Sequence, residues 1–244
     1  MFEGSRQRID RANRHIRDLK SAMEAYCQSD FCNIGVDAEA KEGVSIVRLE
    51  LTRELPGDIP LMLGDAIHNL RAALDFLACD IVRSGGKQPT RYTRFLFDVS
   101  REKLVAALET GALKAARPDL MELIVDAIMP YKGGDDSLYG LNDLDLDERH
   151  RLIVPTFAVV ALHNVAFKDP DKGLVKVGKL DVGVSGEFST ASASGQMKLT
   201  SYASASFQAL FDKGHVFEGQ PIVPTLQRLS QVVAGVVDTI QQAA

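Results

Sequence analysis

The sequence predicts an α+β fold, in which a helical bundle with a β-hairpin precedes an antiparallel β-meander and a C-terminal helix. Apolar residues recur at helical spacing over 5–26 and 58–83. They follow strand-like patterns over much of 152–216 and return to helical spacing after Pro224. Because strands and helices do not alternate one by one, a doubly wound parallel sheet is not expected.

The N-terminal helix is expected over Ser5–Tyr26. Its apolar face is marked by residues at gaps of three and four, namely Ile9, Ala12, Ile16, Leu19, Met23 and Tyr26. The other faces carry many arginines with acids between them, which we interpret as a solvated face rather than an RNA-binding one. A β-hairpin then follows, with strands over 31–39 and 44–52 and a turn at 40–43.

The second helix is expected over Asp58–Arg83. Asp58 is the predicted N-cap, Pro60 fits the first turn, and Gly85 and Gly86 follow the last turn. Its apolar seam consists of Leu63, Ile67, Leu70, Leu74, Leu77 and Ile81. Such a seam packs against another long helix, so we expect an antiparallel pair with the N-terminal helix.

The remaining elements follow in order. A connector over 90–99 leads into short helices over 100–109, from Pro118 to about residue 129, and over 137–150. Strands are expected over 153–167, 174–184, 187–199 and 206–216, with a bulge at Gly178, and a last helix begins at Pro224. We expect one domain over 1–244, with a helical half over about 1–151 and a β-rich half with the closing helix over about 152–244.

Composition limits the classes of function. The net charge of −5 argues against bulk binding to nucleic acid or to a membrane surface. No apolar run approaches the length of a membrane span, and the three cysteines lack the spacing of a zinc ribbon or a disulfide framework. These features favour a cytoplasmic protein, and the long helices favour a homo-oligomer.

Two polar segments interrupt the apolar helices. His68, Arg71 and Asp75 lie along one flank of the seam of the second helix, and residues 141–151 combine acids, arginines, an asparagine and a histidine. Unpaired polar groups lose a few kcal/mol each on burial, so we expect the two segments to come together. The other histidines are weaker candidates: His15 is expected to be exposed, His163 to lie in the core, and His215 to lie in a turn.

Three functions are compatible with this pattern. In the first, the cluster is structural or recognises a small ligand through Asn69, Asn142, Arg149 and Arg151. In the second, the protein is a phosphodiester hydrolase acting on nucleic acid such as RNA, with His68, Arg71, Asp75 and His150 as catalytic residues. In the third, Asp65-x-x-His68 and Asp147-x-x-His150 hold a divalent metal, because each motif places two ligands one helical turn apart.

The same residues carry a resemblance. The run from Leu63 to Asp75, with the downstream segment from Leu141 to Leu152, resembles an uncharacterised family of bacterial proteins, which implies a shared architecture. A more distant resemblance is to HEPN-type helical domains, many of which are dimeric ribonucleases with an Arg-x4–6-His motif. Phe76 stands where that motif has histidine, so Arg71 carries over only as a phosphate-binding residue.

Overall fold

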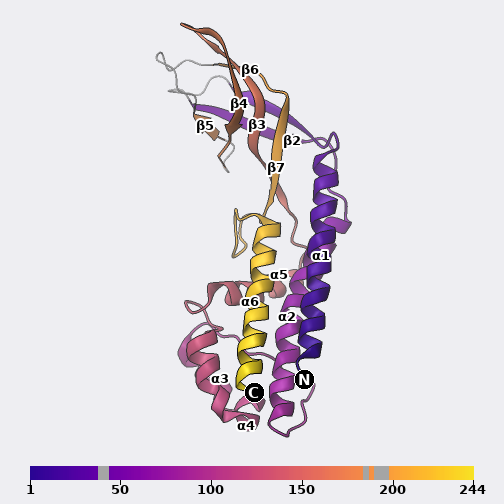
Figure 1. The fold of residues 1–244 in the computed structure, drawn as a ribbon, viewed down its shortest axis with the longest axis vertical. Coiled ribbons are helices and arrows are strands. Elements are labelled where there is room, and N and C mark those ends of the chain that lie inside the picture. The colour runs from indigo at the N-terminus through magenta and orange to yellow at the C-terminus, as the bar shows by residue number, and fades with distance from the viewer. Residues whose placement is uncertain (38–43, 184–186, 190–197) are drawn as a thin grey trace.

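The computed structural model confirms the α+β class and describes residues 1–37, 44–183, 187–189 and 198–244. The molecule is elongated, with helices at one end and strands extending from the other (Figure 1). Both chain termini lie at the helical end, away from the strands. No helix in the described ranges is long and apolar enough to cross a membrane.

Three long helices form the bundle: α1 (Glu3–Cys27), α2 (Asp58–Ser84) and α6 (Ile222–Ala243). The predicted antiparallel pairing of α1 and α2 is confirmed. The backbone N–H of Phe2 donates to Asp80 at 2.6 Å, while the Tyr26 hydroxyl donates to the Arg53 carbonyl at 2.8 Å. The third helix, α6, runs antiparallel to α1, because Asp238 near its end pairs with Arg6.

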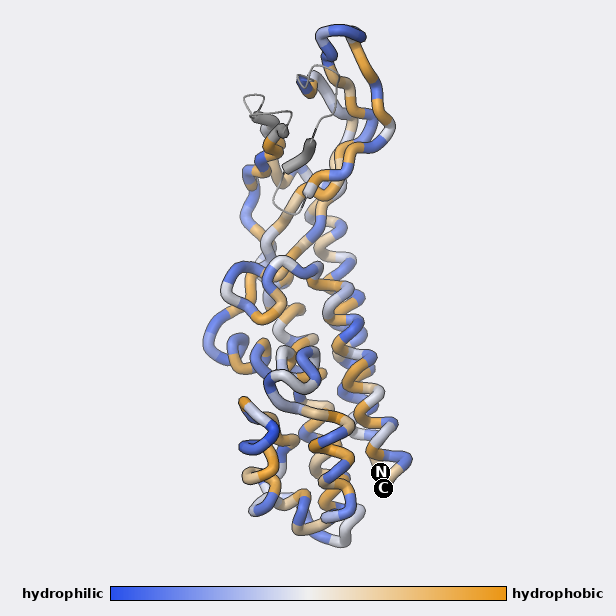
Figure 2. Tube along the Cα trace, turned by 90° about the vertical axis from the view of Figure 1, so that its left-hand side faces the viewer, coloured by the Kyte–Doolittle hydropathy of each residue, from blue (hydrophilic) through white to orange (hydrophobic). Residues whose placement is uncertain are grey.

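The seam of α2 lies at the centre of this bundle. All the residues predicted for it are fully buried, and the apolar face of α6 packs into the same cluster. Burial of each such side chain contributes about 1.5–3 kcal/mol, so this seam is a main source of stability. Figure 2 shows hydrophobic and hydrophilic residues alternating closely along the helices, as expected for helices with one buried face.

The N-cap predicted for α2 is wrong. Gly57 is the N-cap, and Asp58 is already helical. A carboxylate in the first turn is stabilised there by the helix dipole, which explains why the residue suits this end without capping it. The other end is as predicted: Gly85 follows the helix, and Gly86 adopts the left-handed conformation with φ of 71°.

Shorter helical segments cover one side of the bundle. They are α3 (Arg101–Glu109), α4 (Ala112–Ala116), the 3₁₀ helix η2 (Pro118–Leu120), the π-helical η3 (Leu123–Ile128) and α5 (Asp136–Glu148). Ser100 caps α3, and Asp135 caps α5 by accepting from the N–H groups of Ser137 and Leu138. The helix predicted after Pro118 therefore exists, but with 3₁₀ and π segments that apolar periodicity does not distinguish.

The strands form two antiparallel sheets. One has the order β1 (Cys32–Asp37), β2 (Val44–Leu51), β5 (Glu187–Ser189). In the other, β3 (Thr156–Asp169) pairs with β4 (Gly173–Asp181), β6 (Lys198–Ser201) and β7 (Ser204–Leu210). The predicted hairpin is confirmed, whereas its turn at 40–43 and much of the strand predicted over 187–199 lie outside the described residues.

No bulge occurs at Gly178. The pairing of β3 with β4 keeps one register from Ala161 to Asp169. The irregularities lie in β3 itself, where the registers with β6 and β7 shift and Asn164 has a φ of 48°. A separate hydrophobic cluster joins the sheets, formed by Val47, Val159, Leu162, Val165, Phe167 and Val182.

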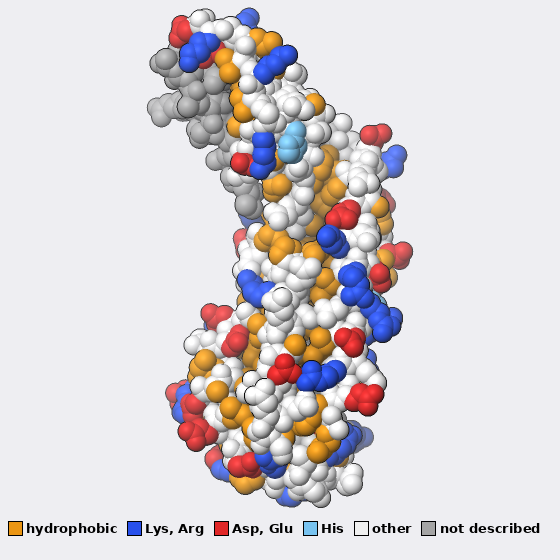
Figure 3. Space-filling view, in the orientation of Figure 1, with side chains coloured by type: hydrophobic (Ala, Val, Ile, Leu, Met, Phe, Trp, Pro, Cys, Tyr) orange, Lys and Arg blue, Asp and Glu red, His pale blue; other side chains and the backbone are white. Residues whose placement is uncertain are grey.

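The arginine-rich face of α1 is exposed. Figure 3 shows Lys and Arg side chains interspersed with Asp and Glu on the α1 side of the bundle. Arg6 pairs with Asp238, while Arg11, Arg14 and Arg17 are exposed. This mixture of signs supports the interpretation of a solvated helix face.

Candidate functional site

The two polar segments meet where α2 packs on α5. Arg71 is the centre of the contact and is almost fully buried. Its Nε donates to Asn142 at 3.2 Å, and its two terminal nitrogens donate to Asp75 at 2.7 Å and to the Phe95 carbonyl at 3.1 Å. The guanidinium also stacks 4.7 Å above the Phe97 ring. Every nitrogen of Arg71 is thus engaged inside the protein, and none is free to hold a phosphate.

A second contact lies one turn away. The Asp145 carboxylate is 1% exposed, with one oxygen 3.1 Å from His68 Nδ1 and the other accepting from Arg149 at 2.5 Å. The His68 ring is 55% exposed. With Nδ1 donating to the carboxylate, Nε2 is left on the solvent side. A buried carboxylate that orients an imidazole in this way suits it to proton transfer.

The structure does not bring the other predicted residues into this contact. Asn69 accepts from Arg8, and Asp65 lies 3.8 Å from His15 on α1. His150 is exposed, and its backbone N–H donates to the Asp147 carbonyl at 3.1 Å. Arg151 pairs with Asp147 on its own helix end, at 3.4 Å. His15 is buried, contrary to prediction, and His163 bonds Ser206 at 2.7 Å.

The predicted metal set is therefore corrected. Asp65, His68, Asp147 and His150 were expected to converge, but Asp65 faces α1 and Asp147 faces His215. Within the described ranges, no group of three or more His, Cys, Asp or Glu residues is placed to hold a metal ion. The reason is geometric: a carboxylate and an imidazole one turn apart share a helix face, but α2 and α5 turn those faces to different neighbours.

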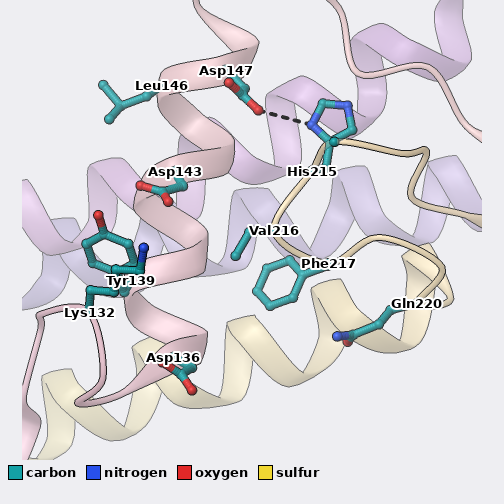
Figure 4. Close-up of a pocket in the computed structure, with 11 residues that line it drawn as sticks. Lys132, Asp136, Tyr139, Asp143, Leu146, Asp147, His215, Val216, Phe217 and Gln220 are labelled. Carbon is teal, nitrogen blue, oxygen red and sulfur yellow. Dashed lines mark hydrogen bonds and ion pairs between the residues drawn. The ribbon is translucent and has the colours of Figure 1, made fainter. Parts of the chain in front are cut away.

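Sequence reasoning missed a cavity on the other side of α5. Its volume is about 850 Å³, and it lies between α5 and the segment from Gly214 to Gln220 that leads into α6 (Figure 4). The α5 wall carries Asp136, Tyr139, Asp143, Leu146 and Asp147, and the facing wall carries His215, Val216, Phe217 and Gln220. The acid density of residues 141–151 was the available signal, but it was assigned entirely to the contact with α2.

The cavity is acidic and contains one internal pair. His215 is 7% exposed, and its Nδ1 lies 3.1 Å from the Asp147 carboxylate, as the dashed line in Figure 4 marks. The pKa of Asp143 is raised, because burial desolvates the carboxylate and Asp147 lies close; Lys132 and a hydrogen bond from Asn142 act in the opposite direction. The pKa of Tyr139 is also raised, by burial and by the charges of Asp143 and Asp98.

Comparisons with known proteins give no relative. No protein-family model, no curated protein and no solved structure matches the chain.

The raised pKa of Asp143 predicts a stability gain on its removal. The native state binds this proton more tightly than the unfolded chain, so ionisation of Asp143 destabilises the fold as pH rises through the raised pKa. Asp143→Asn should therefore raise Tm by about 1–3 °C at pH 7, with the difference disappearing below pH of about 4. Asp171→Asn, at an exposed turn position, is the matched control; an equal or lower Tm for Asp143→Asn would contradict the assignment.

Proposed function

We propose that this chain is a binding protein that recognises a small organic amine in the α5 cavity. The observation that carries the proposal is the placement of Asp143 and Asp147 together in the cavity wall, where burial and the neighbouring Asp147 raise the pKa of Asp143. Residues that lower stability in a concave site with a perturbed pKa are candidates for function. Asp143 and Asp147 lie one helical turn apart, within reach of one ammonium group and its three N–H donors.

The remaining walls favour an organic cation over a bare ion. Leu146 and Val216 line the cavity, and each residue is 46% exposed. Phe217 adds an aromatic ring to the same wall. The apolar part of such an amine would pack on these side chains, and its ammonium would lie at the carboxylates. Small-molecule sites commonly combine apolar walls with a few polar groups in this way.

The contact between α2 and α5 supports a structural role for the polar cluster. Arg71 and Asp145 are buried and satisfied by partners from α2, α5 and the connector after α2. Networks of this kind fix one helix against another, and here they fix the helix that carries Asp143. The ligand site and the structural cluster thus use different, neighbouring faces of α5.

A ribonuclease-like hydrolase is the second candidate. One observation favours it: Asp145 holds His68 with Nε2 on the solvent side. Because Arg71 is buried, an RNA phosphate would need another cation. Arg149 could supply it, since it bonds the same Asp145 carboxylate that holds His68. An RNA-cleavage assay tests the hydrolase. Cleavage by the wild type that His68→Ala abolishes would establish this activity, and no cleavage above a buffer blank would exclude it.

We also propose a cytoplasmic location and homo-oligomerisation through the long helices. Cys27, Cys32 and Cys79 are all free thiols, which suits a reducing compartment. The long helices leave exposed faces, of which the charged face of α1 is one. Sedimentation equilibrium of the purified chain tests the oligomer, and a mass equal to one chain would remove that part of the proposal.

Calorimetric titration with putrescine and benzylamine tests the amine site. Wild-type protein should bind at least one of them at pH 7.5, and Asp143→Asn and Asp147→Asn should each weaken binding by about tenfold, the effect of about 1.4 kcal/mol. Affinity should fall as pH drops through the raised pKa of Asp143, because a neutral carboxyl loses its attraction for the ammonium.

The matched control for the titration is Asp171→Asn, which removes the same charge from an exposed turn. It should leave amine affinity within about twofold of the wild type. Two results would contradict the proposal. One is no heat of binding with either amine at concentrations up to about 10 mM. The other is wild-type affinity in the Asp143→Asn, Asp147→Asn double variant.

A further inference from the structure

A second cavity lies where the bundle meets the strands. It has a volume of about 360 Å³ and is lined by the last turns of α1, by β7 and by the start of α6. Figure 1 shows these three elements converging at the junction between helices and strands. None of its lining residues belongs to the α5 cavity.

The floor of this junction cavity is apolar and firmly held. Met23 and Phe157 are buried in the main core, and Phe207 packs beside them. Phe31 fixes both rings, with centroid distances of 5.8 Å to Phe157 and 4.8 Å to Phe207. Well-formed apolar walls of this size are typical of pockets for small ligands.

Cys27 contributes a neutral wall. Burial, with a smaller contribution from Cys32, raises the pKa of the Cys27 thiol to about 11. The thiol is therefore protonated at neutral pH and is neither a nucleophile nor a metal ligand. It behaves as a small hydrophobic group. The cavity floor can therefore bind a ligand through apolar contact but supplies no reactive group.

The rim of the cavity carries one charge of each sign. Lys20 Nζ lies 3.8 Å from Glu24 Oε1, one helical turn along α1, and both side chains are more than half exposed. Such exposed pairs contribute little, so each charge is available to a ligand. The N-terminus of α6, at Pro221 and Val223, lies at the same cavity and favours a negative group.

We propose that this junction cavity binds a free α-amino acid with a large apolar side chain. A ligand with a single charge would meet a like charge on the rim, from Glu24 or from Lys20. A zwitterion satisfies both: its carboxylate lies at Lys20 and the α6 N-terminus, and its ammonium lies at Glu24. The cavity, at about 360 Å³, is within the size range of small-ligand pockets, and the ring of phenylalanine would cover its apolar floor.

Three ligands with one ring and different charges test this inference. Titrations of L-phenylalanine, 3-phenylpropionate and phenethylamine should use the Asp143→Asn, Asp147→Asn background, which removes amine binding at the α5 cavity. Phenylalanine should bind at least tenfold more tightly than either analogue. Equal binding of phenylpropionate, or no binding of phenylalanine at 10-millimolar scale, would overturn the assignment, whatever the outcome for the α5 cavity.

Rim variants locate the binding. Lys20→Met and Glu24→Gln should each weaken phenylalanine binding at least fivefold. Their controls are Lys87→Met and Glu54→Gln, which remove the same charges at exposed positions elsewhere. Val223→Trp should fill the cavity and abolish binding while circular dichroism stays unchanged. Affinity unaffected by both rim variants would place the ligand elsewhere and overturn the proposal.

Discussion

Replacing Arg71 with methionine should lower the free energy of unfolding by about 3 kcal/mol, or Tm by roughly 6–12 °C. Methionine keeps much of the volume but removes all the hydrogen bonds of the guanidinium. The Asn142 amide oxygen and the Phe95 carbonyl would lose the donor that Arg71 supplies, and the Asp75 carboxylate would lose one of its two donors. The stacking on Phe97 would be lost as well.

The chain offers a close control for this prediction. Arg6 pairs with Asp238 at 2.8 Å, nearly the 2.7 Å of the pair between Arg71 and Asp75. Both partners in the Arg6 pair are about half exposed, whereas the Arg71 side chain is 8% exposed. Arg6→Met should therefore change stability by less than about 1 kcal/mol. Urea denaturation measures both variants, and similar losses would show that the buried network adds nothing beyond a surface pair.

A double-mutant cycle separates the pair from the network. Asp75 also accepts from the backbone N–H of Phe95 at 2.9 Å, so its carboxylate has two partners. Asp75→Asn and Arg71→Met should be non-additive, since each removes part of the same set of hydrogen bonds. A coupling energy near zero would mean that Arg71 acts through its contacts with Asn142 and Phe95 alone.

The helices were predictable because their periodicity is determined by burial. The seam from Leu63 to Ile81 repeats at gaps of three and four, and only an inward-facing stripe has that pattern. The π-helical form of η3 was not predictable, because over six residues an α-helix and a π-helix have nearly the same pattern of apolar residues. The position of the irregularity in β3, at Asn164 rather than Gly178, depends on pairing that a single strand does not encode.

The meeting of α2 and α5 was predictable from the cost of burying unpaired polar groups. The individual partners were not. His68 pairs with Asp145 rather than lying beside His150, and Asp147 pairs with His215, a residue from a segment far along the chain. Within residues 141–151 every position except Leu141, Leu144 and Leu146 is polar, so small differences in helix rotation decide which polar residues face α2. Those rotations are set by packing of Leu141 and Leu144, not by the polar residues themselves.

The two faces of α5 connect the structural cluster to the proposed ligand site. Asn142, Asp145 and Arg149 lie at gaps of three and four and serve the contact with α2. Tyr139, Asp143 and Asp147 lie at gaps of four and face the cavity. Because one rigid helix carries both sets, loosening the contact with α2 through Arg71 should also weaken amine binding.

Gly140→Ala should lower stability by about 1–3 kcal/mol, although alanine is the better helix former by about 1 kcal/mol. A Cβ at Gly140 would lie 2.5 Å from Cζ of Phe217. That ring is 5% exposed and lies between Phe211, 5.9 Å away, and the Arg228 guanidinium, 5.7 Å away. The Phe217 ring therefore has little space into which to move. To accommodate the alanine Cβ, α5 and the segment that carries His215 must move apart.

Gly235 in α6 supplies the matched control, because a Cβ there would meet nothing within 4 Å. Gly235→Ala should stabilise the protein by about 0.5–1 kcal/mol through helix propensity alone. Chemical denaturation compares the two variants, and titration with benzylamine follows the cavity. Because Phe217 forms part of the cavity wall, Gly140→Ala should also weaken amine binding while Gly235→Ala leaves it unchanged. If both alanine substitutions stabilise the protein equally, Phe217 does not pack tightly against α5 at Gly140, and the predicted close contact between the two cavity walls is wrong.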